Sequence, residues 1–271
     1  MMSKNQGFTI VEFMVAMTLG AVILAGVVAA NVSQQRSYVT QDQTAEVQQN
    51  LRAALYYMQR EIRMAGCDPT AMAADAGIVS MAGDSLHIRM DITGGENDGV
   101  DNDLDGVVDE DTNGLDDNGD GLVDEGPEAD EYRYSDGDTN DPDEDVRYSH
   151  YDSDGDGIND CLGRDVGAGN QPVAQNIDAL NFVYLDEDGN ETATRSRVRA
   201  IQVTIVGRTE REIPDFADTT LYVNMQGDTV FEPNPLDPTI IPNPRNYRRT
   251  RVAMEIHGRN LGLTTQGLPL P

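Results

Sequence analysis

An apolar run at residues 8–30 constrains this chain more than any other feature. It has about 23 residues and one charged side chain, Glu12. At 1.5 Å of rise per residue, a helix of this length spans a hydrocarbon core of ~30 Å. A carboxylate is unfavourable near the centre of a bilayer. We therefore predict a membrane-spanning helix whose Glu12 lies near an interface or has a charged partner.

The residues before this run form a short polar leader, 1–7, that ends at Gly7. A secretory signal peptide places its small-residue cleavage site after the apolar run. Here the small residue comes first, and no Ala-x-Ala site closes the run cleanly. We expect the apolar segment to stay on the mature protein.

The pattern Gly-Phe-Thr-x-x-Glu, which starts at Gly7, resembles the class III signal of type IV pilins and type II secretion pseudopilins. The resemblance implies that a prepilin peptidase cuts between Gly7 and Phe8 and methylates the new N-terminal Phe8. It also implies that Glu12 neutralises the N-terminal amine of a neighbouring subunit in a filament. An ordinary uncleaved signal-anchor helix is the alternative.

The helix is expected to continue past the membrane segment, because residues 31–64 contain neither Pro nor Gly. Gly66 and Pro69 supply the stop signal. The result is one helix of ~58 residues, roughly 85 Å long, apolar at 8–30 and amphipathic at 31–66. Its apolar stripe recurs at steps of three and four residues: Leu51, Leu55, Met58, Ile62 and Ala65.

Beyond the helix the pattern changes to short alternating segments that are typical of half-buried strands. We predict a turn at 186–190 and an extended surface loop at 233–244. The fold class is therefore α+β, a long N-terminal helix packed on an antiparallel sheet as in type IV pilins, with a β-rich domain at 67–271. The strand candidates are 86–92, 132–134, 146–151, 180–185, 198–206, 220–225 and 252–257.

Three further segments, 55–66, 176–185 and 247–260, are similar to PilW-like minor pilins. The resemblance implies a subunit that helps initiate or cap a pilus. It implies the prepilin peptidase, other minor pilins, the major pilin and the inner-membrane assembly platform as partners. The chain would lie in the bacterial inner membrane with a periplasmic C-terminal domain, then at the tip of an extracellular pilus. A J-type pseudopilin and a calcium-dependent adhesin with an uncleaved signal anchor are the alternatives.

Most of the net charge of −29 lies in one acidic insertion, 96–160, which has 26 acidic and two basic residues. This charge argues against nucleic acid as a partner, since binding phosphate needs basic patches, and it favours metal cations.

The insertion repeats the pattern D-x-[DN]-x-D-G-x-x-D three times. Calcium binds six to eight hard oxygens, and the glycine allows a sharp turn. The repeats lack the twelfth-position Glu of an EF-hand, so Glu110, Glu125 or a neighbouring loop is expected to supply a further ligand. We predict two to three calcium ions; a disordered acidic linker is the alternative. The predicted ligands are Asp101, Asp103, Asp105, the Val107 carbonyl and Asp109; Asp116, Asn118, Asp120, the Leu122 carbonyl and Asp124; and Asp152, Asp154, Asp156, the Ile158 carbonyl and Asp160.

The remaining reactive residues give no catalytic pattern. Cys67 and Cys161 are permitted to form a disulfide outside the cytoplasm, and two unpaired thiols are equally compatible with the sequence. The three histidines, His87, His150 and His257, are far apart, and no hydrolase, zinc or P-loop motif occurs. The sequence indicates a structural protein rather than an enzyme.

Overall fold

A single long helix dominates the N-terminal part of the computed structural model, which describes residues 9–69, 73–92, 139, 143–233 and 244–261. Helix α1 (Ile10–Met64) is 55 residues long, which confirms the predicted continuous helix. Gly66, two residues beyond its end, has a φ of +73°. Only glycine adopts this backbone readily, so Gly66 ends the helix as the sequence predicts.

Residue contacts divide the chain into two compact units, 1–46 and 47–271. The first unit is the N-terminal part of α1, in which apolar side chains such as Ile10 and Val22 are 79% and 71% exposed. The second unit holds the remainder of α1 and all the strands.

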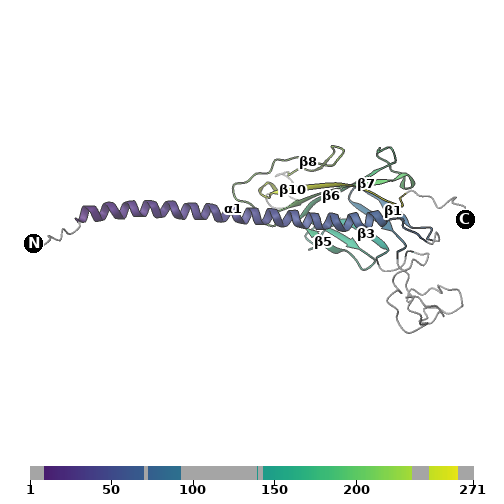
Figure 1. Ribbon diagram of the computed structural model, residues 1–271, viewed down its shortest axis with the longest axis horizontal. Helices are drawn as coiled ribbons and strands as arrows, with labels where there is room; N and C mark the ends of the chain where they lie inside the picture. Colours follow the sequence, from purple (N-terminus) through teal and green to yellow (C-terminus); the bar gives the residue numbers. More distant parts are fainter. Residues whose placement is uncertain (1–8, 70–72, 93–138, 140–142, 234–243, 262–271) are drawn as a thin grey trace, which may run out of the picture. The chain divides into compact units, whose positions relative to one another are not determined.

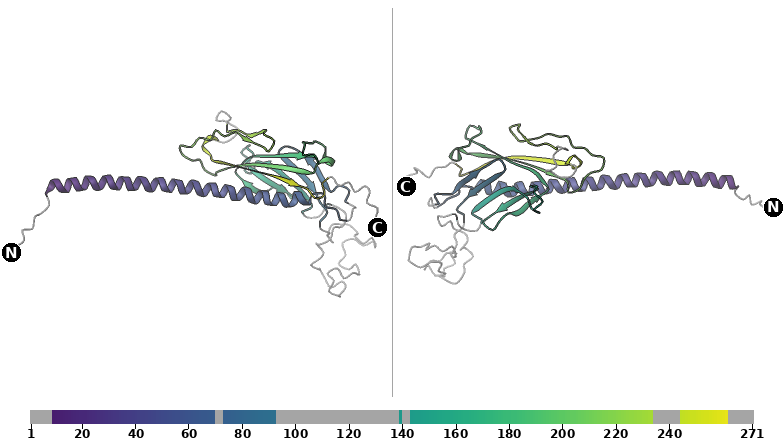
Figure 2. Two further views of the ribbon diagram at one scale, coloured as in Figure 1. Left: turned by 45° about the horizontal axis from the view of Figure 1, so that its top comes forward. Right: turned by 180° about the vertical axis from the view of Figure 1, so that it is seen from behind.

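The second unit contains two antiparallel sheets and a small hairpin, shown from three directions in Figures 1 and 2. One sheet has the order β1-β2-β3-β4-β5 and the other has the order β10-β7-β6. The strands of the first sheet are β1 (Gly77–Met81), β2 (Ser85–Arg89), β3 (Asp145–Tyr151), β4 (Cys161–Asp165) and β5 (Gln171–Gln175). The others are β6 (Ile177–Leu185), β7 (Ala200–Arg208) and β10 (Arg249–His257), with β8 (Tyr222–Val223) and β9 (Thr229–Phe231) forming the hairpin.

The C-terminal part of α1 supplies one wall of the hydrophobic core, and both larger sheets supply the rest. Gly207 of β7 lies so close to the helix that an added Cβ would be 3.1 Å from a Leu51 methyl carbon. The helix therefore packs directly on β7. The predicted stripe is buried throughout: Leu51, Leu55, Met58, Ile62 and Ala65.

This arrangement confirms the predicted α+β fold class, a long helix packed on antiparallel sheets. Five strand candidates coincide with β2, β3, β6, β7 and β10, and the candidate at 220–225 shrinks to the two residues of β8. Strands β1, β4, β5 and β9 were missed, because they are short and contain Gly, Pro or polar residues. Candidate 132–134 and nearly all of the 233–244 loop lie outside the described residues.

The predicted turn at 186–190 is confirmed as a tight hairpin turn. The Asp186 carboxylate accepts the backbone N–H groups of Asp188 and Asn190, both at 3.0 Å. A bridge between Leu185 and Glu191 closes this turn.

Candidate functional site

Glu12 lies in the first turn of α1 and is hydrogen-bonded to Thr9. The Thr9 backbone N–H and hydroxyl both donate to Glu12 Oε2, at 3.0 and 2.9 Å, and the Glu12 N–H donates to Thr9 Oγ1 at 3.2 Å. This reciprocal arrangement is a capping box, which satisfies the free N–H groups at a helix start. Glu12 therefore also organises the start of the helix; Gly7 and Phe8 lie outside the described residues.

Exposed apolar side chains predominate on residues 10–30 of this first unit. The helix contains an 18-residue window of mean hydropathy 2.4, and none of that window is buried within the structure. By length and composition the helix is able to cross a membrane. Contiguous exposed apolar surface of this extent marks a membrane or protein contact.

The third acidic repeat forms the connection between β3 and β4. Carboxylate oxygens of Asp152, Asp154 and Asp156 lie within 4.8 Å of one another, an arrangement that is able to hold a metal ion. The Asp152 carboxylate also accepts the N–H groups of Gly155 and Gly157, both at 2.7 Å. These two glycines have φ values of +82° and +89°, which the pattern's glycines permit. The donor set fits a hard cation such as calcium.

The structure brings together three of the five predicted residues of this repeat. The fourth carboxylate, on Asp160, accepts a 2.9 Å hydrogen bond from the Ser153 hydroxyl, and the Ile158 N–H donates to Asp156 at 2.8 Å. β3 lies inside the predicted insertion 96–160 but is the central strand of the five-stranded sheet, so the third repeat belongs to the folded body. The ligands predicted in the first two repeats, together with Glu110 and Glu125, lie outside the described residues.

The permitted disulfide does not form: Cys67 and Cys161 are both free thiols. Gly66, beside Cys67, donates to the Arg89 carbonyl, and Arg89 pairs with Asp145 at the first residue of β3. Cys161 instead pairs with Tyr151, six residues along that strand. At 3.3 Å per residue the two cysteines lie about 20 Å apart, far beyond the reach of a disulfide. Burial raises the pKa of both thiols.

Glu61 is a buried acid on the helix face that packs against the first sheet. Its carboxylate accepts hydrogen bonds from the Tyr148 hydroxyl and from Arg164 Nε, the latter at 3.0 Å. Arg164 also contacts Asp143 at 2.5 Å. Burial, together with the Glu61 carboxylate, raises the pKa of Tyr148, so that its hydroxyl remains a donor. Glu61 therefore fixes α1 to β3 and β4 by charge as well as by packing.

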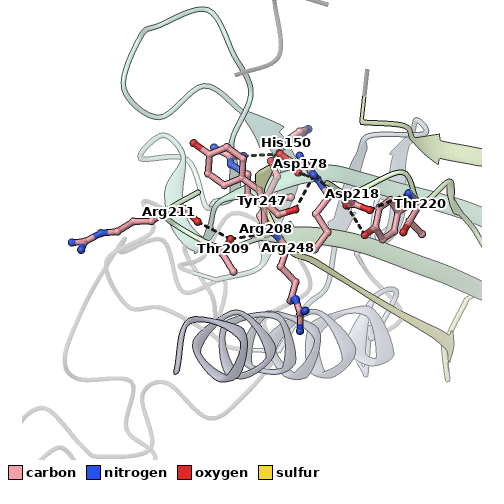
Figure 3. Close-up of polar contacts among 12 residues, drawn as sticks. His150, Asp178, Arg208, Thr209, Arg211, Asp218, Thr220, Tyr247 and Arg248 are labelled. Atoms are coloured by element: carbon pink, nitrogen blue, oxygen red, sulfur yellow. Dashed lines mark hydrogen bonds and ion pairs between the residues drawn. The ribbon is translucent and has the colours of Figure 1, made fainter. Parts of the chain in front are cut away.

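A second set of buried charges lies between the three-stranded sheet and the segment that follows β7 (Figure 3). We call it the ion-pair cluster; it consists of Asp178, Arg208, Asp218 and Arg249. Arg249 Nε lies 2.5 Å from Asp178, and its Nη1 lies 3.2 Å from Asp218. The Arg208 guanidinium contacts Asp178 at 2.7 Å. All four side chains are at most 9% exposed.

Sequence reasoning missed the roles of Thr9, Glu61 and the ion-pair cluster. The Thr-x-x-Glu spacing of residues 9–12 is a readable capping-box signal. Glu61 and the cluster carry no such local signal, because their partners are 30 to 103 residues away along the chain. The three histidines have different partners: His87 contacts Asp145, His150 contacts the Ile177 carbonyl, and His257 contacts Glu255.

Comparisons with known proteins bear on the N-terminal segment. No curated protein matches the chain. Among solved structures, a type IV-like pilin from Thermus thermophilus is 13% identical, with a TM-score of 0.40, over 79% of this chain and 95% of that chain. Residues 2–28 match the family described as the prokaryotic N-terminal methylation motif. The chain therefore carries the prepilin-type methylation signal that the residues around Gly7 predict.

Proposed function

We propose that the protein is a PilW-like minor pilin of a type IV pilus, a structural subunit without enzymatic activity. The observation that carries this proposal is the methylation motif at 2–28 on a helix whose apolar surface is uncovered. The apolar segment 8–30 would hold the subunit in the inner membrane, with the folded body in the periplasm. The assembly platform would then move the subunit into a filament with other minor pilins and the major pilin.

Processing at the leader is the first test. If the prepilin peptidase acts on this chain, N-terminal sequencing of the protein extracted from membranes gives a chain that begins at methylated Phe8. Gly7→Ala should abolish cleavage, whereas Gln6→Ala, one residue earlier, should leave it intact. A chain that begins at Met1 in the wild type would instead support the calcium-dependent adhesin with an uncleaved anchor.

The proposed role of Glu12 is to pair with the N-terminal amine of Phe8 on a neighbouring subunit. An unpaired charge in an apolar bundle is strongly unfavourable, so a charge pair would fix the register of docking. Both hydrogen bonds that the Glu12 carboxylate accepts use Oε2, and the described residues place no hydrogen bond on Oε1. Oε1 would therefore be available to a neighbouring amine while the cap stays closed.

Two substitutions separate the capping role of Glu12 from its charge. Glu12→Gln keeps an acceptor for Thr9 but removes the charge, and Thr9→Ala removes a capping hydroxyl but keeps the charge. We expect Glu12→Gln to remain in the membrane but to be lost from sheared pili, and Thr9→Ala to be incorporated. Normal incorporation of Glu12→Gln would refute the docking role.

The J-type pseudopilin of a type II secretion system is the second candidate, since it shares the leader and the helix. Recovery of the protein with sheared pili supports the minor pilin. Recovery with a secretion complex, together with secretion genes beside its own gene, supports the pseudopilin.

We further propose that the acidic repeats bind two to three calcium ions, supported by the spacing of the repeats and by the carboxylates of Asp152, Asp154 and Asp156. Isothermal titration of the full chain in detergent should give heat with calcium. Asp154→Asn combined with Asp156→Asn should remove part of that heat without disturbing the turn bonds that Asp152 accepts. Glu187→Gln, an exposed acid outside the repeats, is the matched control. Absence of heat in the wild type would overturn the proposal.

A further inference from the structure

Residues 209–233, which follow β7 and contain the β8–β9 hairpin, form a segment that we call the strap. Its first half runs beside the residues that lead into β10. The Thr209 N–H donates to the Arg248 carbonyl at 2.9 Å, and the Asp218 N–H donates to the Arg245 carbonyl at 2.7 Å. The strap is thus an ordered part of the second unit.

The apolar contact beneath the strap is small. It is a separate cluster in which the buried residues are Ala179, Val206 and Tyr222, with Val230 and Phe231 partly buried beside them. The main core has 24 buried residues, and none of its described members comes from the strap. Because hydrophobic stabilisation scales with buried apolar area, this contact alone holds the strap weakly.

Charge also holds the strap, in addition to the side-chain hydrogen bonds from Asn224 to Asn181 of β6 and from Gln226 to Gln202 of β7. Asp218, on the strap, is 3% exposed; it contacts Arg249 Nη1 at 3.2 Å and accepts a hydrogen bond from the Tyr222 hydroxyl at 3.0 Å. Burial and the Asp218 carboxylate raise the pKa of Tyr222 to about 12, so this hydroxyl donates at neutral pH.

Arg249 contacts both the strap and the sheet. Its guanidinium lies 4.8 Å from the centre of the Phe231 ring, also on the strap, and the described residues offer its Nη2 no hydrogen bond. The face of an aromatic ring attracts a cation, which accounts for this position. Asp178 of β6 holds the same guanidinium from the sheet side at 2.5 Å. The Arg249–Asp178 ion pair therefore does not depend on the strap.

We propose that the strap opens as a unit of its own, and that the Asp218–Arg249 pair holds it closed on the three-stranded sheet. A buried carboxylate is tolerated only while it is paired, so the closed position depends on this contact. Opening returns Asp218, Tyr222 and Phe231 to water. The sheet keeps its own ion pairs, Asp178 with Arg208 and with Arg249, and so it stays folded. Local opening of this kind is typical of segments with few buried apolar contacts.

Hydrogen exchange of the full chain in detergent micelles, read by mass spectrometry, tests this inference. Asp218→Ala removes the strap's half of the pair and leaves no buried guanidinium unpaired. We expect peptides from 209–233 to exchange at least tenfold faster in this variant, and peptides from β6 and β7 to change less than twofold. Tyr222→Phe removes only the hydroxyl that Asp218 accepts, so it should give a smaller increase confined to the strap. Glu210→Ala, an exposed acid on the same strap, should change nothing.

The denaturant dependence of hydrogen exchange in the wild type tests the inference without a variant. Added denaturant, kept below the unfolding midpoint, should accelerate exchange in β6 and β7 while strap peptides remain nearly insensitive, because their opening exposes little surface. Unchanged strap exchange in Asp218→Ala would show that the pair does not hold the strap. Equal acceleration of strap and sheet, or failure of the sheet to fold, would show that they open together. Either result overturns the inference.

Discussion

The two parts of α1, residues 10–46 and 47–64, have the same secondary structure but opposite surroundings. In the first part apolar side chains such as Phe13 and Leu24 are 63% and 64% exposed. In the second part Leu51 and Ile62 are fully buried. Both parts are helical, so helix formation does not decide what a side chain contacts. The body covers the second part, whereas the apolar residues 10–30 of the first require lipid or other protein chains to cover them.

The largest expected effect is a core truncation in the second part. Leu51→Ala should lower the free energy of unfolding of the body by about 3 kcal/mol, because it opens a cavity beside Gly207. Denaturant unfolding of the full chain in detergent, followed by near-ultraviolet circular dichroism, measures the change. Leu24→Ala makes the same truncation in the first part and should leave this transition in place. A comparable loss of unfolding free energy in Leu24→Ala would contradict the contrast between the exposed first part and the buried second part of α1.

The next effect concerns the buried acid on the second part. Glu61→Ala should lower the free energy of unfolding by about 2 kcal/mol, because it leaves the buried Tyr148 hydroxyl without its acceptor. Asp143 still pairs with Arg164 in this variant, which limits the loss. The same denaturant experiment applies. Adding Tyr148→Phe to Glu61→Ala should restore part of the stability, and a further loss would refute the assigned contact.

A smaller effect is a response to acid in the body. Burial of Asp145 opposes its charged form, but hydrogen bonds from His87 and Arg89 outweigh burial and lower its pKa overall. The unfolded chain then binds a proton that the folded chain does not, so this stabilisation is present above about pH 4 and is lost as the pH falls through the folded-state pKa. In Asp145→Asn, stability should fall less steeply between pH 5 and pH 3. An unchanged slope in thermal unfolding would contradict this.

The smallest effect is at the start of α1. Thr9→Ala should accelerate amide exchange in the first turn, because the capping box loses its hydroxyl. The unfolding transition of the body should not move, since Thr9 contributes nothing to the core cluster among the described residues. Exchange rates from mass spectrometry decide the first point and circular dichroism the second. A shifted body transition would mean that the two units unfold together.

Much of the candidate site was readable from local sequence, because its signals depend on spacing. The leader motif ending in Glu12 and the D-x-D-x-D-G repeat are both patterns of a few residues. The third repeat shows why: Asp152 and Asp156 meet because glycines turn the chain between and beyond them. The disulfide was undecidable from sequence, since no local pattern shows that Cys67 and Cys161 lie near opposite ends of β3.

The sequence by itself determined the long helix, its buried stripe, the main strands and the methylation signal, because each depends on periodicity or on adjacent residues. Only the tertiary structure decided the sheet order, the separation of the cysteines, the contacts of Glu61 and the fastening of the strap by Asp218 and Arg249. These features join residues that are distant along the chain. The free energy that selects them comes from burying charges and apolar surface together, which no local pattern records.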